Sequence, residues 1–128
     1  MKLLLDTCTL IWLASDPGQL SQNAGTQLAD MTNELFLSDI SVLEIALKYT
    51  RGKIKLPTPP RDWLQNQMGQ WGIRIVVLDR GVIYRTTELP LHHADPFDRL
   101  LVATCLERSM HIVTPDVHIH RYPVSWLW

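Results

Sequence analysis

Short apolar segments alternate with helix-forming segments along the whole chain, and the connections between them are short. The apolar stretches predict strands at 2–5, 35–38, 73–78, 111–114 and 124–126. Helices are predicted between them, beginning near residues 7, 21, 41, 62, 79 and 96. Strands that alternate with helices in short connections predict an α/β fold, a three-layer sandwich around a mainly parallel sheet of four or five strands.

The length of 128 residues suits one domain with one core, so we expect residues 1–128 to form a single domain. Asp6 interrupts the early leucine run and no cleavage site follows, so this start predicts a buried strand rather than a signal peptide. No apolar run is long enough to span a membrane. Cys8 and Cys105 lie among apolar residues, which is typical of reduced thiols in a cytoplasmic protein.

Four acidic residues stand where the predicted strands end or where the adjoining helices begin. Asp6 follows the first strand, Glu44 opens the helix after the second, Asp98 opens the helix before the fourth, and Asp116 follows the fourth. Ligands of parallel α/β sheets bind beyond the carboxyl ends of the strands. We therefore expect all four carboxylates to lie at one edge of the sheet.

The stretch from Asp95 to Arg99 shows why each acid also has a purely local interpretation. Asp95 is predicted as a helix N-cap and Pro96 as the first helical residue, which places Asp98 at the third helical position. Asp98 there either closes a capping box or acts as a metal ligand on a rigid helical turn. The other three acids have similar local interpretations as an N-cap, a capping-box residue and a turn residue.

Caps and turns do not explain why four acids should gather at one edge. Carboxylates that lie together repel one another unless a cation sits among them. Hard divalent cations such as Mg²⁺ prefer oxygen ligands. The chemistry that such a site supports is metal-assisted attack of water on a phosphodiester. The net charge of −1 gives no global signal for nucleic acid, so local basic residues would have to contact phosphate.

The sequence resembles the PIN domains, and among them the VapC-type toxins of bacterial toxin–antitoxin pairs. The resemblance covers nearly the whole chain and is carried by four short motifs: LLDT at 4–7, SVLEIA at 41–46, HHADPFDRLLVA at 92–103 and VTPD at 113–116.

The resemblance implies a Mg²⁺- or Mn²⁺-dependent endoribonuclease with an RNA substrate, a cognate antitoxin and a homodimeric state. Matched residue by residue, Asp6 and Asp98 would be the principal metal ligands. Glu44 would complete the acidic site, and Asp116 would bind metal directly or through water. The resemblance also gives Thr114 a role in orienting Asp116 or a water.

Several neighbouring residues are open to more than one interpretation. Arg99 either pairs with Asp95 or contacts phosphate, while His92 and His93 are predicted to be structural or surface residues, as adjacent side chains point apart. Surface placement is also favoured over RNA contact for two further histidines, His118 and His120. Candidate phosphate contacts, each equally well explained as surface charge, are Lys48, Arg51, Lys53, Lys55 and Arg74.

Three other classes of protein compete with the nuclease hypothesis. Haloacid-dehalogenase phosphatases need two aspartates two residues apart after the first strand, whereas Asp6 is followed by Thr7 and Cys8. Receiver domains are imitated by Asp79 after the third strand, but the paired acids after strand one and the lysine of the last strand are missing. A catalytically silent PIN fold that binds RNA or a protein partner is the remaining alternative.

Overall fold

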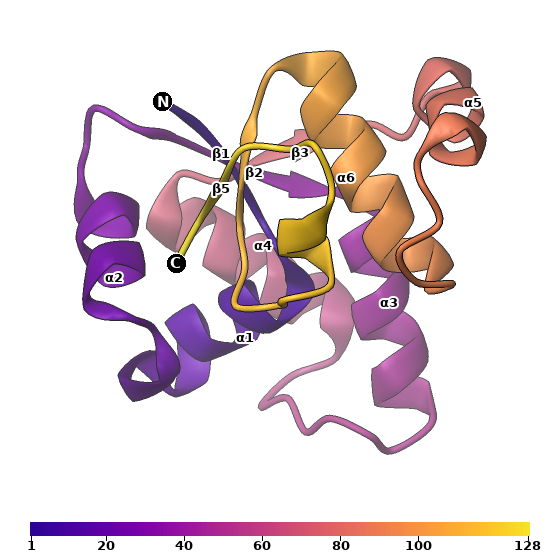
Figure 1. The fold of residues 1–128 in the computed structure, drawn as a ribbon. Coiled ribbons are helices and arrows are strands. Elements are labelled where there is room, and N and C mark those ends of the chain that lie inside the picture. The colour runs from indigo at the N-terminus through magenta and orange to yellow at the C-terminus, as the bar shows by residue number, and fades with distance from the viewer.

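A five-stranded, entirely parallel sheet forms the centre of the molecule (Figure 1). The computed structural model describes residues 1–128, and its strand order is β3-β2-β1-β4-β5. The strands are β1 (Lys2–Leu5), β2 (Glu34–Ser38), β3 (Arg74–Val76), β4 (His111–Val113) and β5 (Trp126–Leu127). The predicted α/β sandwich with a mainly parallel sheet is therefore confirmed.

Six α-helices and two short 3₁₀ turns connect the strands. They are α1 (Thr7–Ser15), η1 (Pro17–Gln19), α2 (Gln22–Ala29), α3 (Asp39–Thr50), α4 (Pro60–Trp71), α5 (Arg80–Glu88), α6 (Pro96–Arg108) and η2 (Ile119–Arg121). Ser21, Asp79 and Asp95 cap the helices they precede, as predicted. Gly72 ends α4 with a φ of 63°, a left-handed conformation that glycine adopts at no steric cost. No helix is long and apolar enough to cross a membrane.

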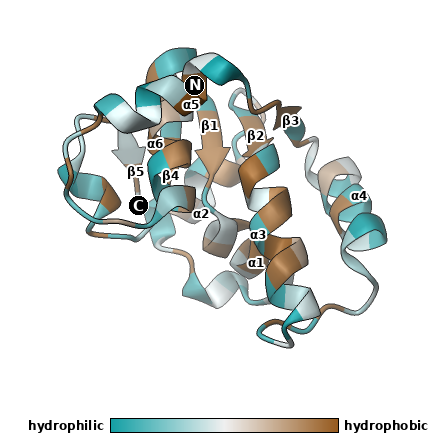
Figure 2. Cartoon of the chain, turned by 90° about the vertical axis from the view of Figure 1, so that its right-hand side faces the viewer, coloured by the Kyte–Doolittle hydropathy of each residue, from teal (hydrophilic) through white to brown (hydrophobic).

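The alternation of side chains along β1 builds a core on each face of the sheet. Leu3 and Leu5 pack into a cluster with α1, α2 and α4, whereas Leu4 packs into a second cluster with α5 and α6. All three leucines are fully buried, and Figure 2 shows β1 as a hydrophobic strand between the helices. Burial of each stabilises the fold by about 1.5–3 kcal/mol. The central strand is thereby fixed, and with it the position of Asp6 at its carboxyl end.

Helix α3 begins earlier than the sequence predicted. The capping box from Ser41 to Glu44 is wrong, because α3 begins at Asp39 and Ser38 caps it, its hydroxyl accepting from the Ile40 amide at 3.1 Å. Ser41 is fully buried in the third helical position, so it packs in the interior and does not cap. Helix α1 begins at Thr7 and is capped by Asp6, in agreement with the local N-cap interpretation of this acid.

Candidate active site

Asp6 lies immediately beyond β1 and is almost completely buried, with 6% of its surface exposed. Its Oδ1 accepts from the Thr7 amide at 2.7 Å, so it caps α1. Its Oδ2 accepts from the Thr114 hydroxyl at 2.6 Å and contacts the Cys8 thiol at 3.6 Å. These bonds from β4 and α1 hold the carboxylate in one orientation at the carboxyl edge of the sheet.

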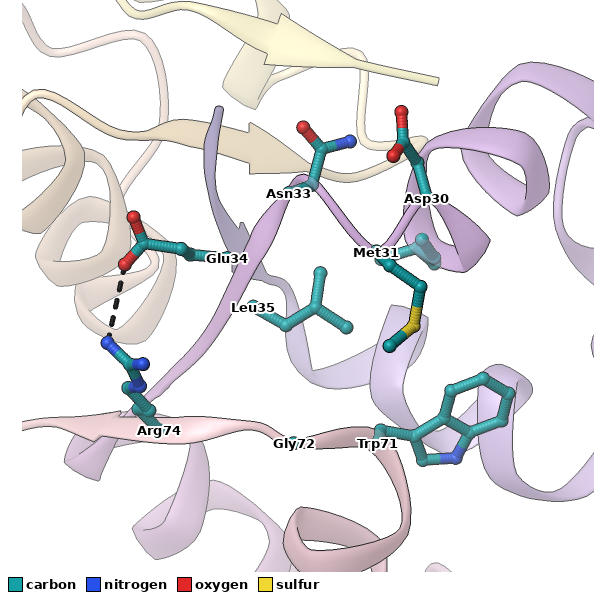
Figure 3. A pocket seen from close by; sticks show the side chains of 9 residues that line it. Asp30, Met31, Asn33, Glu34, Leu35, Trp71, Gly72 and Arg74 are labelled. Carbon is teal, nitrogen blue, oxygen red and sulfur yellow. Dashed lines mark hydrogen bonds and ion pairs between the residues drawn. The ribbon is translucent and has the colours of Figure 1, made fainter.

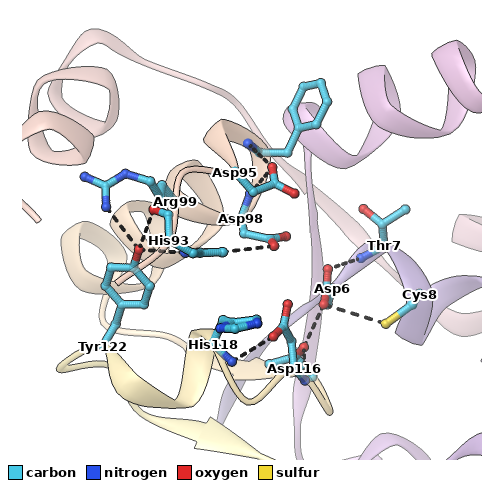
Figure 4. Close-up of polar contacts among 12 residues, drawn as sticks. Asp6, Thr7, Cys8, His93, Asp95, Asp98, Arg99, Asp116, His118 and Tyr122 are labelled. Atoms are coloured by element: carbon cyan, nitrogen blue, oxygen red, sulfur yellow. Dashed lines mark hydrogen bonds and ion pairs between the residues drawn. The ribbon is translucent and has the colours of Figure 1, made fainter. Parts of the chain in front are cut away.

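Asp98 reaches the same place from the first turn of α6. The helix begins as predicted, with the Asp95 carboxylate accepting from the amides of Phe97 and Asp98. The Asp98 side chain does not close a capping box; its Oδ2 lies 3.2 Å from Nε2 of His93. Asp98 therefore points away from its own helix end and into the acidic site (Figure 4).

Asp116 follows β4 after Thr114 and Pro115. Its amide donates to the Thr114 hydroxyl at 3.1 Å, and its Oδ1 accepts from the His118 amide at 2.8 Å. One ligand atom from each of His93, Asp98 and Asp116 lies within 4.8 Å of the others. The Thr114 hydroxyl thus links Asp116 to Asp6, which agrees with the predicted orienting role of Thr114.

Glu44 approaches the site from the second turn of α3. Its Oε1 accepts from the Thr7 hydroxyl at 2.7 Å, and its Oε2 pairs with Lys48 at 2.9 Å. Burial alone would lower the pKa of Lys48, but its hydrogen bond and charge interaction with Glu44 raise it. Lys48, one of the predicted phosphate contacts, therefore lies beside the acids and balances the charge of Glu44.

The acids raise one another's proton affinity. Burial, followed by the charges of Asp6, Asp95, Asp116 and Glu44, raises the pKa of Asp98 to about 8. Burial also raises the pKa of Asp6, against the opposing effect of the Thr114 hydrogen bond. The same buried, negative surroundings raise the pKa of the Cys8 thiol to about 12. Proton affinity rises because negative charge is held here out of water, and a cation would relieve this cost.

The donor set fits a hard divalent cation. Asp6, Asp98 and Asp116 offer carboxylate oxygens from three different elements, as Mg²⁺ and Mn²⁺ prefer. Figure 4 shows these three carboxylates turned toward one another. Neither thiol supports a soft-metal site, since Cys105 is buried elsewhere and Cys8 holds its proton tightly.

The comparisons with known proteins agree with this geometry. The family model of the PIN domain matches residues 3–124. The chain is also 33% identical to Ribonuclease VapC22 of Mycobacterium tuberculosis over 123 residues, which are 94% of this chain and 92% of that protein. The chain belongs to the PIN domain family, and to its VapC type.

Solved structures share the fold of this PIN domain at low sequence identity. The VapBC2 complex of Rickettsia felis, bound to a DNA fragment from their promoter, matches with a TM-score of 0.74 and 16% identity, covering 99% of this chain and 98% of that one. A toxin–antitoxin complex from Klebsiella pneumoniae matches with a TM-score of 0.63 and 15% identity, over 98% and 96%. These likenesses confirm the fold.

Two residues of the PIN domain lie where the sequence did not place them. His93, predicted as structural or surface, faces Asp98 and Asp116 in the site. Both interpretations of Arg99 are wrong, because its guanidinium is buried and donates to backbone carbonyls and to the Tyr122 hydroxyl. Local sequence does not show the contact of Arg99 with Tyr122, which lies 23 positions away, whereas the separation of only five positions between His93 and Asp98 was a signal for theirs.

Two further histidines and Arg74 were also considered as possible contacts of RNA or phosphate. His118 is exposed and stacks on His93 with ring centroids 5.6 Å apart, while His120 stacks on Trp126. Arg74 begins β3 and pairs with Glu34 at 3.4 Å, beside a hollow at the amino edge of the sheet that Trp71 and Met31 also line (Figure 3). Arg74 is thus at the opposite edge from the acids and does not serve their site.

Proposed function

We propose that this PIN domain is a metal-dependent endoribonuclease that hydrolyses RNA phosphodiester bonds, acting as the toxin of a toxin–antitoxin pair. The observation that carries the proposal is that the carboxylates of Asp6, Asp98 and Asp116 turn toward one another at one edge of the sheet, with Glu44 beside them. The 33% identity to a protein named as a ribonuclease supports the same activity.

Mg²⁺ or Mn²⁺ is the cofactor that the site would take, held by Asp6, Asp98 and Asp116, with Glu44 completing the acidic set. When bound, such an ion supplies an activated water and stabilises the negative charge that develops on the phosphate. Three carboxylates favour these ions over zinc or copper, which bind imidazole and thiolate more readily; one imidazole, that of His93, lies beside them.

The other residues keep the carboxylates in position. Thr114 donates to Asp6 and accepts from the Asp116 amide, so one hydroxyl couples two ligands. Thr7 donates its hydroxyl to Glu44 and its amide to Asp6, which couples α1 to α3. Because both bridging residues are almost fully buried, the carboxylates lose little freedom when they bind a cation.

The partners proposed for the domain are an RNA substrate, a cognate antitoxin protein and a second copy of the chain. The similar structure from Klebsiella pneumoniae, described as a toxin–antitoxin complex, supports the antitoxin. Co-expression with the product of the adjacent gene, followed by affinity capture and light scattering, tests both protein partners. Recovery of the toxin alone as a monomer would contradict both.

The activity is tested by incubating the purified protein with a total-RNA pool in Mg²⁺, in Mn²⁺ and in EDTA. Discrete products that need the metal and are absent with Asp98→Asn are the expected result. Asp79→Asn is the matched control, because it makes the same chemical change at an exposed residue outside the acid cluster. Cleavage by Asp98→Asn at the native rate would overturn the assignment of the site. No cleavage by the native protein, with metal still bound, would favour the binding-only alternative.

A further inference from the structure

A chain of hydrogen bonds runs from the interior of the molecule to the acidic site. Arg99 Nη1 donates to the Tyr122 hydroxyl oxygen at 3.0 Å. That hydroxyl lies 2.8 Å from Nδ1 of His93, and Nε2 of His93 lies 3.2 Å from Oδ2 of Asp98. Figure 4 shows the four side chains in this order. Three of them have no role in the metal site proposed above.

The Arg99 guanidinium is a buried cation without a carboxylate partner. Its Nη1 also donates to the Pro90 carbonyl at 2.9 Å, and its Nη2 donates to the Thr86 carbonyl at 2.9 Å. All of its bonds therefore go to neutral oxygens, so its positive charge is not cancelled by an adjacent acid. A charged donor forms stronger hydrogen bonds and makes the phenol that it contacts a better donor in turn.

The donors along the chain favour one ring nitrogen of His93 as the carrier of the proton. Arginine can only donate, so the Tyr122 oxygen accepts from it and keeps its own proton for another acceptor. His93 Nδ1 at 2.8 Å is much closer to this hydroxyl than the His93 carbonyl oxygen at 3.4 Å. This geometry favours Nδ1 as the acceptor, which in a neutral ring leaves the proton on Nε2, facing Asp98.

We propose that Tyr122 and Arg99 act as positioning residues that hold His93 as an Nε2–H donor to Asp98, so that His93 orients this carboxylate and is not itself a metal ligand. The inference rests on the proposed metal site and adds three residues that support it. A hydrogen bond to a ligating carboxylate fixes its rotamer, and losing such support typically costs about 10–100-fold in metal affinity.

The distances among Tyr122, His93 and Asp98 are also compatible with the other tautomer of His93, in which Nδ1 carries the proton. If Nδ1 of His93 carried the proton, it would donate to Tyr122, and the Tyr122 hydroxyl would turn to the His93 carbonyl at 3.4 Å. Nε2 would then be free to bind the metal beside Asp98 and Asp116. His93 would become a ligand, and the role of Arg99 would be only structural.

The tautomer is read by ¹⁵N NMR of the imidazole in metal-free protein, which needs neither metal nor RNA. The spectrum is recorded at about pH 9, well above the ordinary pKa of an imidazole. Protonation of His93 at Nε2, and a mixture of tautomers in Tyr122→Phe, are the expected results. Protonation at Nδ1 in the native protein would overturn the proposal. Because this readout is independent of RNA cleavage, absence of nuclease activity would leave its outcome intact.

Mn²⁺ affinity of four variants separates positioning from ligation. Tyr122→Phe should weaken binding about 10-fold, whereas Tyr84→Phe, at an exposed tyrosine of α5, should not change it. In Tyr122→Phe, one N–H of Arg99 Nη1 loses its acceptor while the other keeps the Pro90 carbonyl, so the melting temperature of this variant is measured beside its Mn²⁺ affinity. His93→Gln retains an N–H donor and should bind nearly as the native protein does, while His93→Leu should bind as weakly as Tyr122→Phe. Native affinity in both Tyr122→Phe and His93→Leu would refute positioning.

Discussion

Two aspartates, Asp98 in α6 and Asp79 before α5, lie near opposite ends of α6 and have opposite electrostatic surroundings. Asp98 lies in the first turn, where burial and four neighbouring carboxylates raise its pKa to about 8. Asp79 lies against the last turn, where a hydrogen bond from the Val82 amide and then the charge of Arg108 lower the pKa of Asp79. Ten residues separate Asp98 from Arg108, about 15 Å along the helix.

Both aspartates stand at helix starts, so local sequence gives them the same function. Asp79 does cap α5, with its Oδ1 accepting from the Val82 amide at 3.0 Å. Helix α6 is instead capped by Asp95, and the Asp98 side chain contacts His93 and faces the other acids. The comparison shows that two aspartates with similar local sequence contexts lie in opposite electrostatic surroundings, because distant strands bring other acids to only one of them.

The largest difference between the two aspartates should appear in RNA cleavage. Asp98→Asn removes a proposed metal ligand, and we expect the rate to fall about 100-fold or more, since a bound ion contributes several kcal/mol to the transition state. Asp79→Asn should cleave within about twofold of the native rate, because it only loses an exposed ion pair. The initial rates of both variants are measured on one RNA whose cleavage site has been mapped. Equal losses of rate would contradict a special role of Asp98 in cleavage.

Metal binding should separate the two variants next. In saturating Mn²⁺, at about 100 times the dissociation constant, the native protein should gain about 2.7 kcal/mol in free energy of unfolding. Asp79→Asn should show the same rise in melting temperature relative to EDTA, and Asp98→Asn should show little or none. A full rise in Asp98→Asn would mean that this carboxylate does not hold the ion.

The pH dependence of stability should differ in the metal-free protein. The folded-state pKa of Asp98, about 8, is above its ordinary value of 3.8, so the folded protein holds this proton more tightly than the unfolded chain. Stability should therefore fall as pH rises between these two values and level off above the higher one. Asp98→Asn should raise the melting temperature in EDTA by several degrees at pH 8 and much less at pH 5. A clear loss of melting temperature would show that Asp98 mainly supports the helix.

The smallest effect is expected from Asp79. Its pKa is lowered, so its stabilising contribution is present above the ordinary value and is lost as pH falls through the folded-state value. Asp79→Asn should lower the melting temperature at neutral pH by only about 1–2 °C, since exposed ion pairs contribute little and asparagine still caps a helix. This loss should shrink in high salt. A loss as large as that of a core substitution would show that the pair with Arg108 is structural.

Much of the fold could be predicted because it depends on local sequence patterns of apolar, capping and helix-forming residues. The alternation of apolar segments with helices gave the parallel sheet, and Asp95 and Pro96 gave the start of α6. The start of α3 was predicted wrongly, because Ser41 and Glu44 match the capping-box pattern. In the structure Ser41 is buried inside the protein and Ser38 is the N-cap. The local sequence pattern therefore gave the wrong helix start where burial of Ser41 decided the position of the helix.

The sequence by itself determined the parallel fold and the gathering of Asp6, Asp98 and Asp116 at its carboxyl edge, because strand direction alone decides where the chain leaves each strand. Only the tertiary structure decided the partners of those acids. His93 faces Asp98, and Arg99 reaches Tyr122 across 23 positions of sequence. The contact of Arg99 with Tyr122 depends on how η2 packs against α6, and packing of distant segments leaves no local pattern in the sequence.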